Sequence, residues 1–143
     1  MFRKLTDRLF ASPQIGLAEV DEARAMGIGL IINNRPEGES DDQTPGSAIE
    51  AAARAAGIDY VAIPVTHAGF SEGQVTAMVA ELSGTDQPVL AYCRSGTRST
   101  LLWALAQASE GRNPDDLSAA AAEAGYDLTP IRAMLDMLAA RKA

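Results

Sequence analysis

The only cysteine of the chain, Cys93, lies between an apolar run at positions 88–92 and a short loop with a glycine and two arginines. The loop and its continuation read Arg94-Ser95-Gly96-Thr97-Arg98-Ser99, and an apolar pattern of helical period follows directly. A helix N-terminus offers unpaired backbone N–H groups, which bind anions and stabilise a thiolate. The stretch therefore predicts an anion cradle with a nucleophilic thiol at its base.

Each residue of this loop has an expected part in the cradle. Gly96 permits backbone angles that let successive N–H groups point inward. Arg98 can clamp two oxygens of an anion through its planar guanidinium, so Cys93 and Arg98 are the expected catalytic residues. Ser99 can hydrogen-bond to the sulfur or cap the helix. Contacts with the substrate are also expected from Ser95, Thr97 and Arg94, although Arg94 could equally remain in solvent.

The composition is that of one soluble globular domain of 143 residues, with 47% apolar and 22% charged residues. A single cysteine excludes an internal disulfide and fits a reducing compartment. The sequence shows no signal-peptide core and no membrane span, so we expect a cytoplasmic protein. The net charge of −7 argues against a nucleic-acid partner. One cysteine and one histidine also argue against a structural zinc site, and we expect neither a metal nor a cofactor.

Strand and helix patterns alternate along the chain. Apolar runs predict strands at 5–10, 29–33, 58–65 and 88–92, of which the first has the weakest pattern. Helical periodicity and capping residues predict helices at 17–26, 44–56, 71–83, 101–108, 113–124 and 129–138. Thr44 is the expected N-cap of the second helix, Ser71 and Gln74 should form a capping box at the third, and Gly125 should end the fifth. The expected fold is α/β. It has a mostly parallel sheet of about four to five strands covered by helices on both faces, within a single domain 1–143 that ends in a helical tail.

Ligands of such sheets bind beyond the carboxyl ends of the strands, where the Cys93 loop should meet the loops after Ile32 and Val65. We expect Asn33 and Arg35 to orient the anion, unless Asn33 and its neighbour only hold the loop through side-chain-to-backbone bonds. The remaining acidic side chains of that loop are expected to be solvated: Glu37, Glu39, Asp41 and Asp42.

His67 lies in the loop that follows Val65. Histidine titrates near neutral pH, so His67 is a candidate acid or base; the alternative is a solvated or structural side chain.

Four segments resemble the phosphatase-like domains that occur alone in bacteria or fused to beta-lactamase-like persulfide dioxygenase domains. They are residues 11–14, 31–39, 63–65 and 91–99, and the resemblance covers most of residues 4–110. It implies the fold of dual-specificity protein tyrosine phosphatases, and members of the family have been assigned both as phosphatases and as sulfur transferases. It also implies a persulfide dioxygenase as partner.

Two departures from the phosphatase pattern bear on the reaction. Cysteine phosphatases place five residues between cysteine and arginine, whereas four separate Cys93 from Arg98, which resembles the rhodanese loop that cradles a persulfide sulfur. Phosphatases also use an acid, normally an aspartate, to protonate the leaving oxygen, and residues 66–70 contain no aspartate. Tyr92 stands where phosphatases carry a histidine.

These observations give three hypotheses in order. The first is a rhodanese-type sulfurtransferase, in which Cys93 takes sulfane sulfur from thiosulfate or glutathione persulfide and passes it to a thiol acceptor. The second is a cysteine-dependent phosphatase that hydrolyses a phosphoester through a phosphocysteine. The third is a non-catalytic module that binds anions or senses redox state through reversible oxidation of the cysteine.

Overall fold

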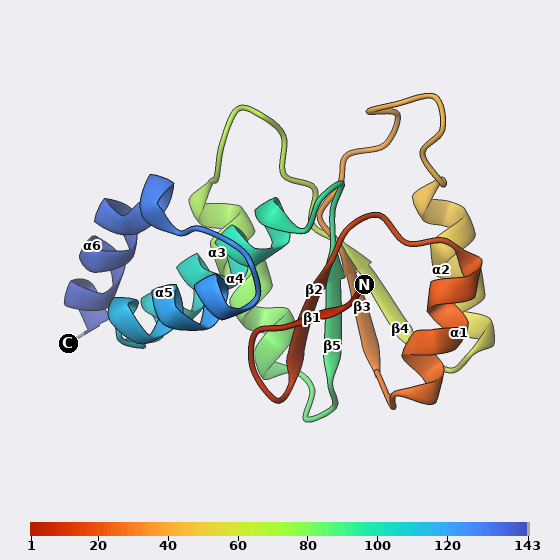
Figure 1. Ribbon diagram of the computed structural model, residues 1–143, viewed down its shortest axis with the longest axis horizontal. Coiled ribbons are helices and arrows are strands. Elements are labelled where there is room, and N and C mark those ends of the chain that lie inside the picture. The colour runs from red at the N-terminus through yellow and green to blue at the C-terminus, as the bar shows by residue number, and fades with distance from the viewer. Residues whose placement is uncertain (143) are drawn as a thin grey trace.

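The computed structural model describes residues 1–142 and contains one five-stranded sheet in the order β1-β2-β5-β3-β4 (Figure 1). The strands are β1 (Arg3–Lys4), β2 (Leu9–Ser12), β3 (Leu30–Asn33), β4 (Asp59–Ala62) and β5 (Val89–Tyr92). The α-helices are α1 (Leu17–Ala25), α2 (Gly46–Ala55), α3 (Glu72–Ser83), α4 (Thr97–Ser109), α5 (Pro114–Glu123) and α6 (Arg132–Lys142). A short 3₁₀ turn, η1 (Thr129–Ile131), precedes α6.

Strand β5 lies at the centre of the sheet and pairs in parallel with both β2 and β3, while β4 pairs in parallel with β3. Only β1 is antiparallel to its neighbour. The register aligns the last residues of the parallel strands, because Tyr92 lies opposite both Ser12 and Asn33. The residue after Tyr92 is Cys93, so the parallel register puts the thiol at the centre of the carboxyl edge.

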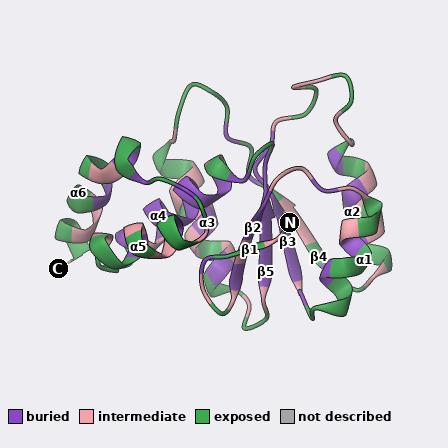
Figure 2. Cartoon of the chain, viewed as in Figure 1, coloured by how far each residue is buried: buried purple, intermediate pink, exposed green. Residues whose placement is uncertain are grey.

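Helices cover both faces of the sheet, with α1 and α2 on one side and α3 to α6 on the other (Figure 1). All residues of β3 and β5 are buried, and their side chains alternate between two apolar clusters (Figure 2). Ile31 and Leu90 pack with α1 and α2, whereas Ile32 and Ala91 pack with the other helices. This continuous burial explains why the central strands read as unbroken apolar runs. The α/β class predicted from the sequence is confirmed.

The strand predicted at 5–10 is displaced along the chain: only Leu9 and Phe10 of it belong to a strand, which is β2. Residues 5–8 form the turn between β1 and β2, in which the N–H of Leu5 donates to the Leu9 carbonyl at 2.9 Å. The Thr6 hydroxyl oxygen accepts from the N–H groups of Arg8 and Leu9 at 3.1 and 3.0 Å. These local side-chain-to-backbone bonds compete with strand pairing and close a hairpin instead.

Two helix starts differ in how they are capped. The predicted box at α3 is confirmed, because Ser71 accepts from the Gln74 N–H at 3.2 Å and Gln74 accepts from the Ser71 N–H at 2.8 Å. The predicted Thr44 cap of α2 is wrong. That helix begins at Gly46, whose N–H donates to the Glu37 carboxylate at 2.6 Å. Within residues 1–142, no helix is long and apolar enough to cross a membrane.

Candidate active site

The loop between β5 and α4 puts the Cys93 sulfur at the start of a thirteen-residue helix. Gly96 adopts a φ of +94°, which a residue with a side chain rarely adopts, and its N–H donates to the Cys93 sulfur at 3.1 Å. Helix α4 is fixed behind it by Thr100, whose N–H and hydroxyl donate to the Gly96 carbonyl at 3.0 and 2.8 Å. The thiol is buried in this cradle.

The loop that carries the sulfur has further unpaired backbone donors. Within the described residues 1–142, four N–H groups of the loop and first helical turn donate to no other group of the protein: those of Arg94, Ser95, Arg98 and Ser99. A helix N-terminus with several unpaired N–H groups favours negative charge. The arrangement can therefore receive the oxygens of a small anion next to the thiol.

Glu39 and the backbone of Val65 hold the Arg98 side chain in place. Arg98 Nη1 donates to Glu39 Oε2 and to the Val65 carbonyl, each at 2.7 Å, and Nη2 donates to Glu39 Oε1 at 2.8 Å. A guanidinium has five N–H donors, so these bonds leave Nε and one N–H of Nη2 on the adjacent edge. The pKa of Arg98 is raised, first by the bond to Glu39 and also by the nearby Cys93 sulfur. The Cys93 sulfur is near enough to this guanidinium to raise its pKa, and the two remaining N–H groups can bind two oxygens of an anion.

Glu39 lies in the site, although the sequence predicted a solvated side chain. Its carboxylate is 16% exposed and binds Arg35 as well as Arg98, rather than lying in solvent. The hydrogen bond from Arg98 lowers the pKa of Glu39 to about 2, with a further contribution from Arg35 and in opposition to burial. The side chain is therefore charged at neutral pH and cannot donate a proton. Asp41 and Asp42 are exposed, as expected.

Arg35 and Asn33 lie at the same edge, and their side chains bind other side chains and the backbone of the protein. Arg35 is buried, and its guanidinium donates to Glu39, Gln14 and Ser40, each at 3.0 Å. Asn33 accepts from the Arg35 N–H at 2.9 Å and donates to the Tyr60 hydroxyl at 2.9 Å. Arg35 thus supports Glu39, which in turn holds Arg98.

Ser99 contacts the neighbouring strand end instead of the sulfur. Its hydroxyl donates to Asn34 Oδ1 at 2.7 Å, and Asn34 Nδ2 donates to the Ile63 carbonyl at 2.9 Å.

Tyr92 is also buried, and burial raises its pKa. In the described part of the chain its hydroxyl has no hydrogen-bond partner. It therefore remains neutral at the base of the loop.

The other predicted site residues lie at the surface. Arg94, Ser95 and Thr97 are exposed on the loop, and the Ser95 hydroxyl donates to Thr97 Oγ1 at 3.0 Å. His67 is exposed in the loop after β4, and among residues 1–142 it makes no hydrogen bond or ion pair. No group of three or more His, Cys, Asp or Glu side chains within the same residues is placed to hold a metal ion.

Sequence reasoning missed a second residue besides Glu39. The Tyr126 hydroxyl donates to the carbonyl of Ser95 at 3.1 Å, from the segment that follows α5. The only sequence signal for Glu39 is its position four residues after an arginine. For Tyr126 there is none, because the contact joins residues 31 positions apart.

Residues 1–110 match the family model for the phosphatase-like domain of beta-lactamase hydrolase-like proteins. The chain belongs to this family. A beta-lactamase hydrolase-like protein of Xylella fastidiosa is 35% identical over 125 residues, which are 87% of this chain and 29% of that protein. The corresponding protein of Agrobacterium fabrum is 33% identical over 126 residues. The chain thus spans less than a third of the length of these relatives.

Solved structures agree with the family assignment. A candidate phosphatase from Neisseria meningitidis is 36% identical and superposes with a TM-score of 0.81, over 95% of this chain and 96% of that one. A kinase-associated phosphatase is 18% identical, covers 97% of this chain and has a TM-score of 0.73, a likeness in fold alone. The protein therefore has the fold of the dual-specificity tyrosine phosphatases, as the family resemblance implied.

Proposed function

We propose that the protein is a cysteine-dependent phosphoester hydrolase in which Cys93 is the nucleophile and Arg98 binds the phosphoryl oxygens. The observation that carries this proposal is the orientation of Arg98. Glu39 occupies the end of the guanidinium, so the adjacent edge remains for an anion beside a sulfur at a helix N-terminus. The likeness to the Neisseria protein, itself described as a candidate phosphatase, supports the same chemistry. Sulfur transfer, which the sequence predicted first, therefore becomes the second candidate.

The reaction would proceed in two displacements at phosphorus. The Cys93 thiolate attacks phosphorus, an S–P bond forms and the bond to the leaving oxygen breaks. Water then attacks the phosphocysteine, the S–P bond breaks, and inorganic phosphate and the thiolate are released. Arg98 and the unpaired N–H groups stabilise the charge on the equatorial oxygens in both steps. Arg35 and Asn33 would act by holding the loop that carries Glu39.

The identity of the proton donor limits the substrates. Glu39 has a pKa of about 2 and is charged at neutral pH, so it cannot protonate a leaving oxygen. His67 is exposed, and water can also serve as the source of the proton. Leaving groups that need little protonation are the best substrates for such a site. We therefore propose aryl phosphates, whose phenolate is a good leaving group, ahead of alkyl phosphates.

Sulfur transfer is the second candidate, favoured by the four-residue spacing between Cys93 and Arg98 and by the lack of an aspartate after β4. The thiolate would attack the outer sulfur of thiosulfate, the S–S bond would break and sulfite would leave. An acceptor thiolate would then attack the outer sulfur of the Cys93 persulfide. This reaction needs no acid at the leaving group. In this case a persulfide dioxygenase is the proposed partner.

The two candidates are separated by turnover of the purified protein with p-nitrophenyl phosphate and with thiosulfate plus cyanide. We expect phosphate release by the wild type and none by Cys93→Ser. The opposite result, thiocyanate formation that depends on Cys93 with no phosphate release, would establish sulfur transfer instead. Lack of both activities would contradict an enzymatic role and leave the anion-binding or redox-sensing module.

A further inference from the structure

We propose that Tyr126 is a positioning residue, which fixes the Ser95–Gly96 peptide so that its N–H points at the Cys93 sulfur. This rests on Cys93 acting as a thiolate nucleophile, as in the proposed function, and holds for phosphoester hydrolysis and sulfur transfer alike. Tyr126 lies beyond residues 1–110, the part of the chain that the family model covers.

The peptide group between Ser95 and Gly96 makes a hydrogen bond at each of its two ends. The Ser95 carbonyl accepts from the Tyr126 hydroxyl at 3.1 Å, and the Gly96 N–H donates to the Cys93 sulfur at 3.1 Å. Both groups belong to the same peptide unit, which is planar and trans, so the C=O and the N–H point in opposite directions. A hydroxyl that fixes the carbonyl therefore also fixes the N–H on the sulfur side. Without it, the peptide could rotate and withdraw the N–H.

Close contact adds to this restraint. Gly96 lies so near to Tyr126 that a Cβ on Gly96 would overlap the Tyr126 hydroxyl, and the same Cβ would lie 3.3 Å from the backbone of Ser12. The Tyr126 side chain is itself buried. The ring therefore fills the space behind the loop, on the opposite side of the peptide from the sulfur.

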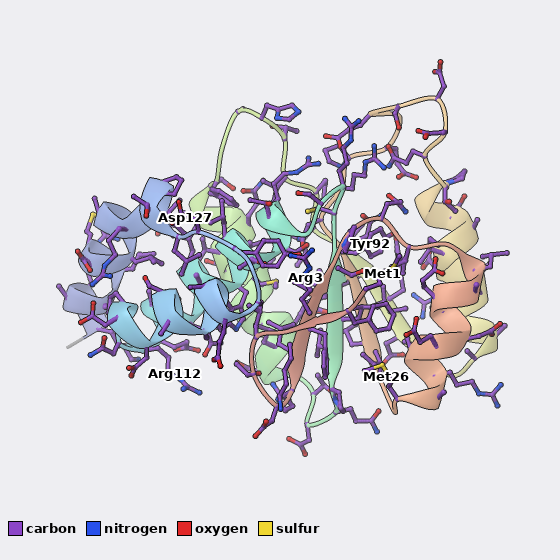
Figure 3. The ribbon with its side chains drawn as sticks, in the orientation of Figure 1. Met1, Arg3, Met26, Tyr92, Arg112 and Asp127 are labelled. Atoms are coloured by element: carbon purple, nitrogen blue, oxygen red, sulfur yellow. The ribbon has the colours of Figure 1, made fainter. Side chains whose placement is uncertain are left out.

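Tyr126 is held from two sides. Gly125 follows the C-terminal cap of α5 and has a φ of +94°, and the Tyr126 N–H donates back to the Ala121 carbonyl at 2.8 Å, the bond that typically closes a helix end. The side chain of Arg3 is labelled in Figure 3. Its guanidinium lies 5.1 Å from the centroid of the Tyr126 ring and donates to the Ala124 carbonyl at 3.2 Å. Strand β1 and the end of α5 thus fix the ring together.

The hydroxyl is suited to remain a donor. Burial raises the pKa of Tyr126, and the neighbouring sulfur of Cys93 contributes in the same direction, while Arg3 opposes them. A protonated hydroxyl is required, because a phenolate has no hydrogen to give to the Ser95 carbonyl. The restraint on the peptide should therefore persist throughout the neutral pH range.

The test is a titration of thiolate absorbance near 240 nm in the full chain, for the wild type and Tyr126→Phe. Cys93 is the only cysteine, so the spectrum of Cys93→Ser, alone and combined with Tyr126→Phe, provides the baseline. We expect the midpoint to rise by about half to one pH unit in Tyr126→Phe, as weakening of a hydrogen bond to a charged sulfur implies. The acidic limb of the pH–rate profile should move by the same amount.

A matched control is Asp127→Asn, which loosens the same segment. The Asp127 carboxylate accepts from the Thr129 N–H at 2.9 Å and from its hydroxyl at 2.6 Å, but does not touch the loop of Cys93. We expect lower thermal stability with an unchanged midpoint. An equal shift in Asp127→Asn, or an unchanged midpoint in Tyr126→Phe, would overturn the role of Tyr126. A wild-type thiol that does not ionise by pH 9 would contradict the nucleophile itself, and this inference with it.

Discussion

Two loops rise beyond the carboxyl ends of neighbouring parallel strands and differ in how they are held (Figure 1). The loop after β3, residues 34–45, is fixed by buried Arg35 and by Glu39, which binds two guanidinium groups. In the loop after β4, Val65 is held through its backbone by Asn34 and Arg98, but the described residues 66–69 beyond it make only local hydrogen bonds, such as that from the Gly69 N–H to the Thr66 carbonyl at 3.3 Å. Its histidine is exposed.

The roles of the charged residues in these two loops are the reverse of what their residue types suggest. A run of acidic residues in a polar loop is typical of a solvated surface, yet Glu39 reaches the candidate catalytic arginine. A single histidine beside an anion cradle suggests acid–base chemistry, yet His67 lies in the loop with fewer contacts. What decides the role of a charged side chain is the counter-charge that the fold brings to it. That information lies in the pairing of distant residues.

The largest effect is expected when Arg98 loses its forked shape. Arg98→Lys keeps the charge but removes the parallel N–H pair and the bidentate contact with Glu39. We expect kcat/KM for an aryl phosphate to fall by about a hundredfold to a thousandfold, the range for loss of a donor to transition-state charge. Arg94→Lys is the matched control on the same loop, and its exposed side chain should change the rate little. Equal losses in both variants would contradict the assignment.

The next largest effect is expected for Glu39→Gln, which removes the negative charge that holds the loop after β3 to Arg98. Two guanidinium groups then lack their counter-charge, so we expect a loss of about 1–3 kcal/mol in the free energy of unfolding and a decrease in kcat/KM. Urea denaturation and steady-state kinetics measure both effects. Asp41→Asn, an exposed carboxylate on the same loop, is the control and should leave both unchanged. A fully stable and active Glu39→Gln would show that Arg98 needs no partner.

Acid should weaken the same loop. The ion pairs lower the pKa of Glu39 from 4.5 to about 2, so the stability that they provide is fully present above pH 4.5 and is lost as the pH falls toward 2. The difference in unfolding free energy between the wild type and Glu39→Gln should therefore shrink over this interval. Urea unfolding at several pH values measures it. A difference that stays constant from pH 6 to pH 2 would refute the ion-pair account.

The sequence predicted the parts of the fold that depend on local pattern. A few neighbouring residues were enough to predict the buried strands β3 and β5 and the capping box of α3. The same is true of the glycine that follows α5. The strand predicted at 5–10 starts only at Leu9, because the Thr6 hydroxyl closes a turn before it, which the apolar pattern does not reveal.

The candidate site was predictable only where it is contiguous in sequence. Cys93, Gly96 and Arg98 lie within one loop, so their chemistry could be inferred from spacing. Glu39 and Tyr126 contact that loop from 59 and 31 residues away, and no periodicity encodes such pairs. The parallel register explains the first, because it brings the ends of β3 and β5 together. The second depends on how the C-terminal helices pack.

The smallest effect on kcat/KM is expected for a substitution in the loop after β4, which is the less restrained of the two loops. His67→Ala should change kcat/KM for an aryl phosphate by no more than about twofold, since general acid catalysis at full strength would contribute a hundredfold or more. The comparison is sharpened with an alkyl phosphate, whose leaving group depends more on protonation. A loss of that larger size with either substrate would make His67 the acid and reverse the contrast between the two loops.

The most direct test of the central claim is the intact mass of the protein after acid quenching during turnover, with Cys93→Ser as the control. Incubation with an aryl phosphate should add one phosphoryl group to the wild type and nothing to the variant. Incubation with thiosulfate should leave both masses unchanged. Addition of a single sulfur atom to Cys93, without any phosphoryl adduct, would contradict phosphoester hydrolysis and assign the site to sulfur transfer.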